Sequence, residues 1–553
     1  MPIISTDISI EDEYIDWDEQ TSIFVGFTGT SVSSSLSSGI QVGSSTVVFT
    51  TGGTYVLYGS YNGTIIVNAP GEEVRLVLNN LSVLSSQGSG LICLDASKLI
   101  ISLPEETMNS IVDNLNYNYG DSELMKVNAA VYSKTDLVIN GEGTLFIQGQ
   151  YQDGLKANDS LVISDVSLTI QANDDAISVN DSLLIQSGTF NLESGGDGIK
   201  VSNDDDELGY LVIQDGDFVI HSFNDGLQAS SYILIHGGTF EIVSGNGSNS
   251  ILSSDESSKG IKASLGLEIT EGTFTIDALD DSLHSDELVS IVGGVLTLSS
   301  GDQAIHSDNI LSISSGEITV VTSVEGFEAK NISISGGTIN ISSSDDGING
   351  SDPDVTAPDL PGTTGGDPTT STATMTISGG IITIKSIEDS IDINGSFYQS
   401  GGIILISGPT NGMQSAVDYD IEWVVTGGLL IAVSGFGAET KVPSSNSTQV
   451  SLMYNTQSIQ SVGKTVSIMD GEGNVMYSFT PTVSYQAITI TSPDLIQGDS
   501  YTLVLGGTIS GSIENGFYLN PTIEDGVSLQ TMKLSSLVNS YNVTTFPSGP
   551  PRP

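Results

Sequence analysis

The stretch DDAISVNDSLLIQSGTFNLESGGDGIKV (residues 174–201) contains one complete unit of a repeat and the beginning of the next. Asp175 is followed by a small residue and then by a short apolar run, and the same order begins again 22 residues later at Asp197. Two further short apolar runs lie between them, separated by Asn, Asp, Ser and Gly, which favour turns. Three strand-like runs in each repeat, without helical periodicity, indicate a β-rich repeat protein.

The repeat continues through most of the chain. The small residue that follows the acid is a convenient marker, and successive markers are separated by 22, 22, 28, 34, 22, 22, 22, 21, 43 and 22 residues. The longer intervals fit single coils that carry insertions. A constant period with three short strands predicts an all-β fold, a right-handed parallel β-helix of about 22 residues per coil. The markers are Gly154, Ala176, Gly198, Gly226, Gly260, Ser282, Ala304, Gly326, Gly347, Ser390 and Gly412.

Changes in composition divide the chain into five parts. We expect an acidic arm at 1–22, the first coils at 23–120, and the regular helix body at 121–435. Within the body, residues 351–374 are rich in Pro, Gly and Thr and predict an extruded loop. Runs such as VSLMY and AITITS at 436–520 predict antiparallel strands that cap the helix end. Residues 521–553 are expected to form a tail.

Alternation along each strand predicts which side chains face inward. In DGIKV, Ile199 and Val201 should point into the core and Lys200 outward. The coil aromatics occupy the same inward position, which argues against recognition of cellulose by exposed aromatic platforms; they are Phe190, Phe218, Phe240 and Phe274. Aromatics expected at the surface are Tyr151, Tyr210, Phe223 and Tyr232.

The net charge limits the partners of this protein. Fourteen basic residues against 67 acidic ones give a formal charge of −53. Such a surface repels nucleic acid and anionic membranes, and no stretch approaches the roughly 18 apolar residues of a membrane span. It attracts divalent cations, although acidity also keeps a strand-rich protein soluble. The single cysteine, Cys93, cannot form a disulfide within the chain.

The acids that precede the markers, and second acids one position earlier, form a column of candidate metal ligands. Strands stack about 4.8 Å apart, so neighbouring carboxylates would repel by roughly 1–4 kcal/mol per pair unless a cation such as Ca²⁺ lies between them. The alternative is that these acids only form turns. Lys259 interrupts the column, which predicts separate clusters with several calcium ions. The candidates are Asp153, Asp174, Asp175, Asp197, Asp225, Asp280, Asp281, Asp302, Asp345, Asp346, Glu388 and Asp389.

A second row, two residues after each marker, is expected to face outward. It contains three of the few lysines, Lys156, Lys200 and Lys262. These lysines are candidates to bind sugar carboxylates beside calcium, and the alternative is that they neutralise neighbouring aspartates. The whole row reads Lys156, Ser178, Lys200, Gln228, Lys262, His284, His306, Glu328, Asn349, Asp392 and Gln414.

Most of the chain resembles a known family. The resemblance runs from TTGGTYVLYGSYNGTIIVNAPGEEVRLVLNNLSV (50–83), through the DDGI and SGGT coils, to SGPTNGMQSAVDYD (407–420) and the stretch 463–507. The chain is similar to the bacterial calcium-binding parallel β-helix carbohydrate-binding domain proteins. Those proteins bind cellulose and polygalacturonate and are shaped like certain polysaccharide lyases. The resemblance implies calcium on aspartate ladders, and binding rather than cleavage. The aspartates that match its metal motif are Asp174, Asp175, Asp197, Asp225, Asp280, Asp281, Asp345 and Asp346, with departures at Lys259, Gln303 and Glu325.

Three functions remain open from the sequence. The first is non-catalytic, calcium-dependent binding of an acidic, pectin-like polysaccharide outside the cell or on its surface. The second is a surface-layer, adhesin or filament subunit that self-assembles and is stiffened by calcium. The third is a calcium-dependent polysaccharide lyase in which Lys156, Lys200 or Lys262 removes the C5 proton of a uronate. The first residues, MPIISTDISI, lack the pattern of a signal peptide, so a signal was removed or was never present.

Overall fold

The computed structural model describes residues 13–117, 119, 124–205, 207–251, 257–353, 372–437, 440–511, 513–514 and 516–543. The chain divides into two compact units, Met1–Glu287 and Leu288–Pro553, and each is described by itself. Most of the predicted arm and of the predicted loop 351–374 lies outside the described residues. The described residues are all β apart from one short 3-10 helix, Leu124–Lys126.

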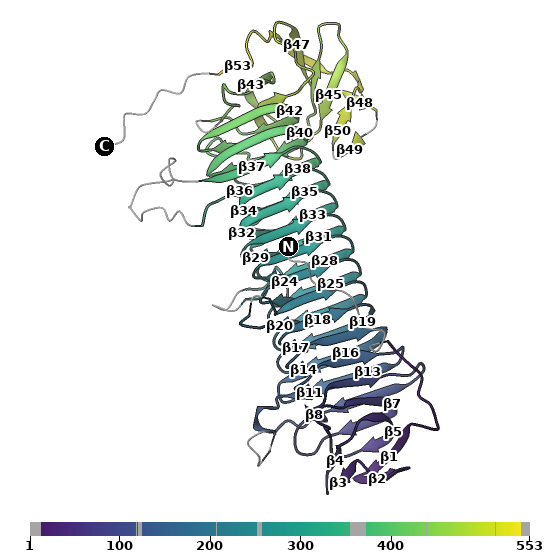
Figure 1. Cartoon of the computed structure of the whole chain (residues 1–553). Coiled ribbons are helices and arrows are strands. Elements are labelled where there is room, and N and C mark those ends of the chain that lie inside the picture. Colours follow the sequence, from purple (N-terminus) through teal and green to yellow (C-terminus); the bar gives the residue numbers. More distant parts are fainter. Residues whose placement is uncertain are drawn as a thin grey trace, which may run out of the picture. The chain divides into compact units, whose positions relative to one another are not determined.

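Each coil of the first unit contributes three strands, and each strand pairs in parallel with its counterpart one coil later (Figure 1). One face contains β14 (Asp153–Ala157), β17 (Ile177–Val179) and β20 (Ile199–Val201). The second contains β15 (Leu161–Ser164), β18 (Ser182–Ile185) and β21 (Tyr210–Ile213). The third contains β16 (Val166–Ala172), β19 (Gly188–Ser194) and β22 (Asp217–Ser222). The predicted parallel β-helix is confirmed.

The register of the first face agrees with the sequence markers. Residues one place after successive markers pair with one another: Leu155, Ile177, Ile199, Leu227, Ile261 and Leu283. The 28- and 34-residue coils keep this register because their extra residues lie outside the strands. Those strands are β23 (Leu227–Ala229), β26 (Ile261–Ala263) and β29 (Leu283–Ser285).

The core is formed by the inward side chains that alternation predicts. Phe190, Phe218, Phe240 and Phe274 stack with centroids 4.5–4.6 Å apart and nearly parallel rings. All four are fully buried, so the coil aromatics belong to the core as expected. Toward the N-terminus the parallel pairing includes β1 (Ile23–Gly29), β5 (Gly53–Tyr61) and β7 (Glu73–Leu84), and β2 (Ser31–Ser34) is antiparallel to β1.

The second unit continues the same pattern. Its first face contains β32 (Gln303–Ile313), β34 (Glu325–Ile334), β36 (Ile348–Gly350), β39 (Ile391–Ile393) and β41 (Asp418–Tyr419). Asp392 pairs with Asp418, and Ile393 with Tyr419. The sequence alignment that placed Gln414 opposite Asp392 is therefore wrong by four residues. Residues 408–417 form no strand, so the chain travels further before it rejoins the face.

Antiparallel strands close the end of the second unit's helix, as predicted. β46 (Tyr485–Thr491) pairs antiparallel with both β42 (Glu422–Ser434), which belongs to the last coil, and β43 (Ser451–Gln460). A separate antiparallel sheet has the order β49 (Ile513–Glu514), β50 (Phe517–Leu519), β45 (Val475–Phe479), β44 (Val466–Met469), β47 (Ser500–Leu505) and β52 (Val527–Lys533). The segment 521–543, assigned above to a tail, holds β51 (Thr522–Glu524), β52 and β53 (Val538–Tyr541). Among the described residues, no helix has the length and apolar character needed to span a membrane.

Candidate metal centre

The acid column lies at one corner of the coils, where the chain turns into the first face. In Asp175, Asp197 and Asp225, one carboxylate oxygen accepts a hydrogen bond from the backbone one coil later. The Asp197 N–H donates to Asp175 Oδ1 (2.9 Å), and the Asp225 N–H donates to Asp197 Oδ1 (2.9 Å). The Lys259 N–H donates to Asp225 Oδ1 (2.8 Å). These aspartates therefore join consecutive coils, and Oδ2 is the oxygen left for a cation.

In the first unit that cation is a lysine of the chain itself. The outward row predicted from the sequence lies beside the acid column, and its lysines turn back toward the aspartates. The Nζ–Oδ2 distances are 3.2 Å for Lys156–Asp153, 2.8 Å for Lys200–Asp197 and 3.8 Å for Lys262–Asp225.

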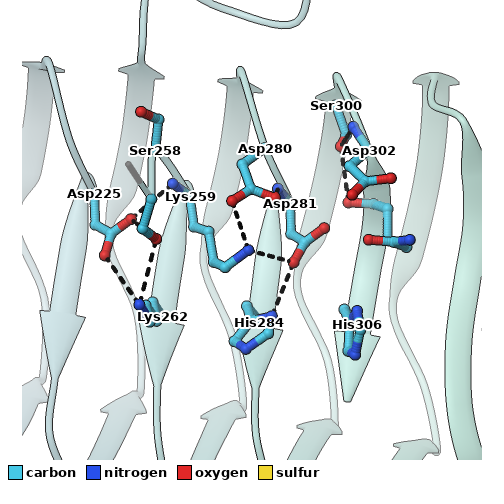
Figure 2. Close-up of polar contacts among 12 residues, drawn as sticks. Asp225, Ser258, Lys259, Lys262, Asp280, Asp281, His284, Ser300, Asp302 and His306 are labelled. Atoms are coloured by element: carbon cyan, nitrogen blue, oxygen red, sulfur yellow. Dashed lines mark hydrogen bonds and ion pairs between the residues drawn. The ribbon is translucent and has the colours of Figure 1, made fainter. Parts of the chain in front are cut away.

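Lys259, which interrupts the acid column, also pairs with aspartates of that column. Its ammonium lies 2.7 Å from Asp280 Oδ2 and 2.8 Å from Asp281 Oδ2 (Figure 2). His284 Nδ1 is 2.8 Å from the same Asp281 oxygen. Burial raises the pKa of Asp281, but the His284 hydrogen bond and the Lys259 charge outweigh it and lower this pKa to about 2. Asp281 is thus an ionised carboxylate whose negative charge is balanced by Lys259 and His284 of the same chain.

One group in the first unit has the spacing of a metal site. Carboxylate oxygens of Asp153, Asp174 and Asp175 lie within 4.8 Å of one another. Asp174 is solvent-accessible, whereas Asp153 and Asp175 are buried. Burial, together with the Asp197 charge, raises the pKa of Asp175 to about 7.

The second unit repeats the backbone contacts of the column. The Asp389 N–H donates to Asp346 Oδ1 (2.8 Å), and the Ser415 N–H donates to Asp389 Oδ1. Glu388 accepts a hydrogen bond from Gln414 Nε2. Asp302, also in this unit, donates its backbone N–H to Ser300 Oγ at 3.0 Å (Figure 2).

After His306, the outward row of the second unit carries oxygen-bearing side chains, whereas the row of the first unit contains lysines. Glu328, Asn349, Asp392 and Asp418 follow one another on consecutive coils. Oxygens of Asp389, Asp392 and Asp418 lie within 4.8 Å of one another, and Lys441 forms an ion pair with Asp418. In the described part of this unit, no ion pair reaches four of the acids, which are Asp345, Asp346, Asp389 and Asp392. We call Glu325, Glu328, Asp345, Asp346, Asn349, Asp389 and Asp392 the oxygen cluster.

Two buried atoms of the oxygen cluster have no hydrogen-bond partner. They are Glu325 Oε2 and Asn349 Oδ1, whereas Asn349 Nδ2 donates to Glu325 Oε1 (3.1 Å). Burial, followed by the charges of Asp392 and Asp389, raises the pKa of Asp346 to about 8. Asp281 and Asp346 occupy equivalent places in the repeat, yet their pKa values lie on opposite sides of neutrality. The difference follows from Lys259 and His284, which have no equivalent beside Asp346. The donor set of this cluster is all oxygen, which suits Ca²⁺.

The sequence located the acid column but not all of the oxygen cluster. The predicted residues in or next to it are Asp345, Asp346, Glu388 and Asp389. Four members of the cluster, and Asp418 beside it, were absent from the predicted ligand set; the four are Glu325, Glu328, Asn349 and Asp392. The signal for Glu328, Asn349 and Asp392 is that the outward row carries no lysine or histidine after His306, whereas Glu325 stands in the acid column itself.

The family-model match among the comparisons with known proteins lies mainly in the first unit. Residues 43–304 match the family model "Carbohydrate-binding domain-containing protein". A protein of that description from Acetivibrio thermocellus is 29% identical over 136 residues, which are 24% of this chain and 48% of that protein. The chain thus spans about half the length of this curated relative. A solved structure, a polysaccharide lyase-like protein from C. thermocellum in a gadolinium derivative, matches 40% of this chain and 91% of its own at 25% identity, with a TM-score of 0.39.

Proposed function

We propose that this protein binds an acidic polysaccharide through calcium ions held by the oxygen cluster. The similarity to carbohydrate-binding domains supports polysaccharide as the class of ligand. The observation that carries the proposal is the pair of buried, unpartnered oxygens, Glu325 Oε2 and Asn349 Oδ1, beside acids that no ion pair neutralises. A buried acceptor without a partner costs roughly 1–3 kcal/mol, and a cation would remove that cost.

The geometry also explains how a bound ion would remain open to a ligand. Ca²⁺ takes 6–8 oxygens at about 2.3–2.6 Å. Asp346 and Asp389 each use one oxygen to join coils, so each offers only the other to an ion. The remaining positions would be filled by water or by the carboxylate and hydroxyl groups of a uronate. A protein of charge −53 needs such a bridge to hold an anionic polymer.

We further propose that binding proceeds without cleavage. A lyase needs a neutral base beside the uronate C5 proton. Although burial lowers the pKa of Lys200, Asp197 and Asp175 outweigh it and raise this pKa, so the ammonium stays protonated. Lys156 and Lys262 are paired with aspartates in the same way. Because polysaccharides of this kind are extracellular polymers, we place the protein outside the cell or at its surface.

Equilibrium dialysis with calcium and affinity electrophoresis in polygalacturonate test this proposal. We expect calcium to bind, and EDTA to abolish retardation by the polymer. The double variant Asp346→Asn, Asp392→Asn should lose calcium and polymer together. Asp499→Asn is the matched control, since it removes one exposed carboxylate in the same unit outside the cluster.

Two results would contradict the proposal. Retardation that survives EDTA would show that calcium does not bridge the two anions. Accumulation of unsaturated uronate product under saturating calcium would show that the protein is a lyase.

A further inference from the structure

A row of apolar side chains runs along the outside of the second face of the first unit. Each member stands between two inward residues of its strand, as Val162 stands between Leu161 and Ile163, so alternation turns it away from the core. The strands are β9 (Lys98–Ser102), β12 (Leu137–Asn140), β15, β18, β21 and β24 (Tyr232–Ile235). The members pair in register on consecutive coils, and we call them the outer apolar row: Ile100, Val138, Val162, Leu184, Val212 and Leu234.

A charged residue stands at each end of the outer apolar row. Arg75 of β7 pairs in register with Ile100, and Glu268 of β27 (Gly266–Ile269) pairs with Leu234. Between these two charges every outward position of this register is aliphatic. The row is therefore a bounded apolar stripe on a face that otherwise meets water.

Most of the outer apolar row is buried although it faces outward. The exposed fraction is 0% for Ile100 and Val212, 2% for Val138 and 8% for Leu234. An antiparallel or solenoid face that meets water normally carries polar side chains on its outer side. Outward aliphatic side chains are shielded only where a further segment of chain packs over them, and burying apolar surface favours such packing by about 25 cal/mol per Å².

The N-terminal arm reaches the beginning of this row. The Arg75 guanidinium donates from Nη1 to the Ile15 carbonyl oxygen (3.3 Å). The Tyr14 ring packs against Gly141, directly after β12, where an added Cβ would lie 2.9 Å from ring carbon Cδ2. Tyr14 thus lies beside a later coil than Arg75 does. As residue numbers decrease, the arm leads from the Arg75 end of the row toward its Leu234 end.

The sequence before Tyr14 has the pattern that such a surface requires. In TDISIED (6–12), Ile8 and Ile10 alternate with polar residues, so an extended segment would place both isoleucines on one side and its acids in water. Ile8 precedes Tyr14 by six residues, which span about 20 Å in an extended chain. The four coil steps from Val138 to Leu234 span about 19 Å. The two lengths agree.

We propose that residues 1–12 are a strap that docks along the outer apolar row of the same chain. Ile10 packs over Leu184 and Val212, and Ile8 packs near Leu234. The strap keeps this apolar stripe from association with other copies, since contiguous apolar surface favours such contacts. The inference depends on neither calcium nor polysaccharide, so it stands apart from the proposed function.

Cross-linking of the full chain tests the strap. Ile10→Cys combined with Leu184→Cys supplies two thiols, while the native Cys93 is buried. With a short bis-maleimide at low protein concentration, we expect a cross-link within one chain. It should form about tenfold faster than in the matched control, Ser9→Cys combined with Leu184→Cys, because Ser9 would face water and meet the second thiol only by chance.

A second measurement does not rely on introduced thiols. Ile8→Ser combined with Ile10→Ser should uncover the outer apolar row and raise the fluorescence of anilinonaphthalene sulfonate, a dye that binds exposed apolar surface. We expect an increase of about threefold or more over the wild type, since the stripe spans several coils. Ser9→Asn, a polar change between the two isoleucines, should leave the signal at the wild-type level.

Each outcome decides the inference. Cross-links that join two chains would mean that the arm of a second copy occupies the row, which overturns a strap within one chain. Equal rates for the Ile10→Cys and Ser9→Cys pairs, or failure to cross-link, would show that the arm is not seated there. Unchanged dye fluorescence in the double serine variant would show that another segment shields the row, and it would overturn the inference as well. Fast cross-linking within one chain together with the rise in fluorescence supports it.

Discussion

Replacing Lys259 by methionine removes an ammonium that neutralises two carboxylates. The lysine side chain is 12% exposed and that of Asp281 is 2% exposed, so water compensates little for the loss. Methionine keeps most of the volume of the side chain, and packing changes should be small. The variant therefore isolates the effect of the buried charge.

The magnitude follows from the geometry of this ion pair. Removing one partner of a buried pair costs about 3–5 kcal/mol, because the other charge is left without compensation. His284 remains 2.8 Å from Asp281 and can carry a proton, so we expect the lower end, about 3 kcal/mol. For a unit of this size that loss lowers the melting temperature by about 6–10 °C.

The assay is thermal and urea unfolding of the wild type and Lys259→Met in EDTA, repeated with calcium. Lys126→Met, the loss of an exposed lysine in the same unit, should change little. Calcium should recover part of the loss in Lys259→Met, since the Asp280 and Asp281 oxygens are then available to an ion. A change below about 1 kcal/mol in EDTA would refute the reasoning, since it would mean that the ammonium has no net stabilising effect.

Three further predictions concern other parts of the repeat. The pKa of Asp346 rises to about 8 on folding from an ordinary 3.8, so its contribution to stability is complete below about pH 4 and is lost as pH rises through about 8. In EDTA, the melting temperature should therefore fall more between about pH 5 and pH 8 in the wild type than in Asp346→Asn. Equal slopes of melting temperature against pH would contradict this. Phe218→Ala opens the aromatic stack and should lower the free energy of unfolding in urea by about 3–5 kcal/mol. Val219→Ala, at the exposed neighbouring position, should lower it by less than about 0.5 kcal/mol. Gly198→Val should cost about 1–3 kcal/mol in the same assay, because a Cβ there would lie 2.4 Å from Ile220 Cγ2; wild-type stability would show that the coils can separate locally.

The sequence predicted the fold well because the repeat fixes both period and alternation. Ile199 and Val201 are buried on either side of Lys200, as the two-residue period of a strand requires. The prediction failed at PTNGMQS (409–415), which resembles the repeat motif but forms no strand. Asp418, four residues beyond Gln414, takes the expected place. Composition alone cannot distinguish a turn that looks like a coil corner from one that forms strand hydrogen bonds.

The candidate metal site was only partly predictable, because its chemistry depends on two rows at once. The acid column is visible in the sequence, and so is the row of Lys156 and Lys200. Whether a lysine turns back to its own aspartate depends on side-chain direction within the coil, which spacing does not reveal. The unpartnered oxygens of Glu325 and Asn349 likewise depend on burial, so the oxygen cluster emerged only from the structure.

The unequal coil lengths have a consequence for how such a chain can change. Gln228 pairs with Lys200, 28 residues earlier, and Asp392 pairs with Asn349, 43 residues earlier, yet both retain the register of a 22-residue coil. Strand pairing therefore keeps its register whatever the number of residues between two paired strands. Surface segments can be acquired, exchanged or engineered at these positions without redesign of the interior, so the solenoid is a natural display scaffold.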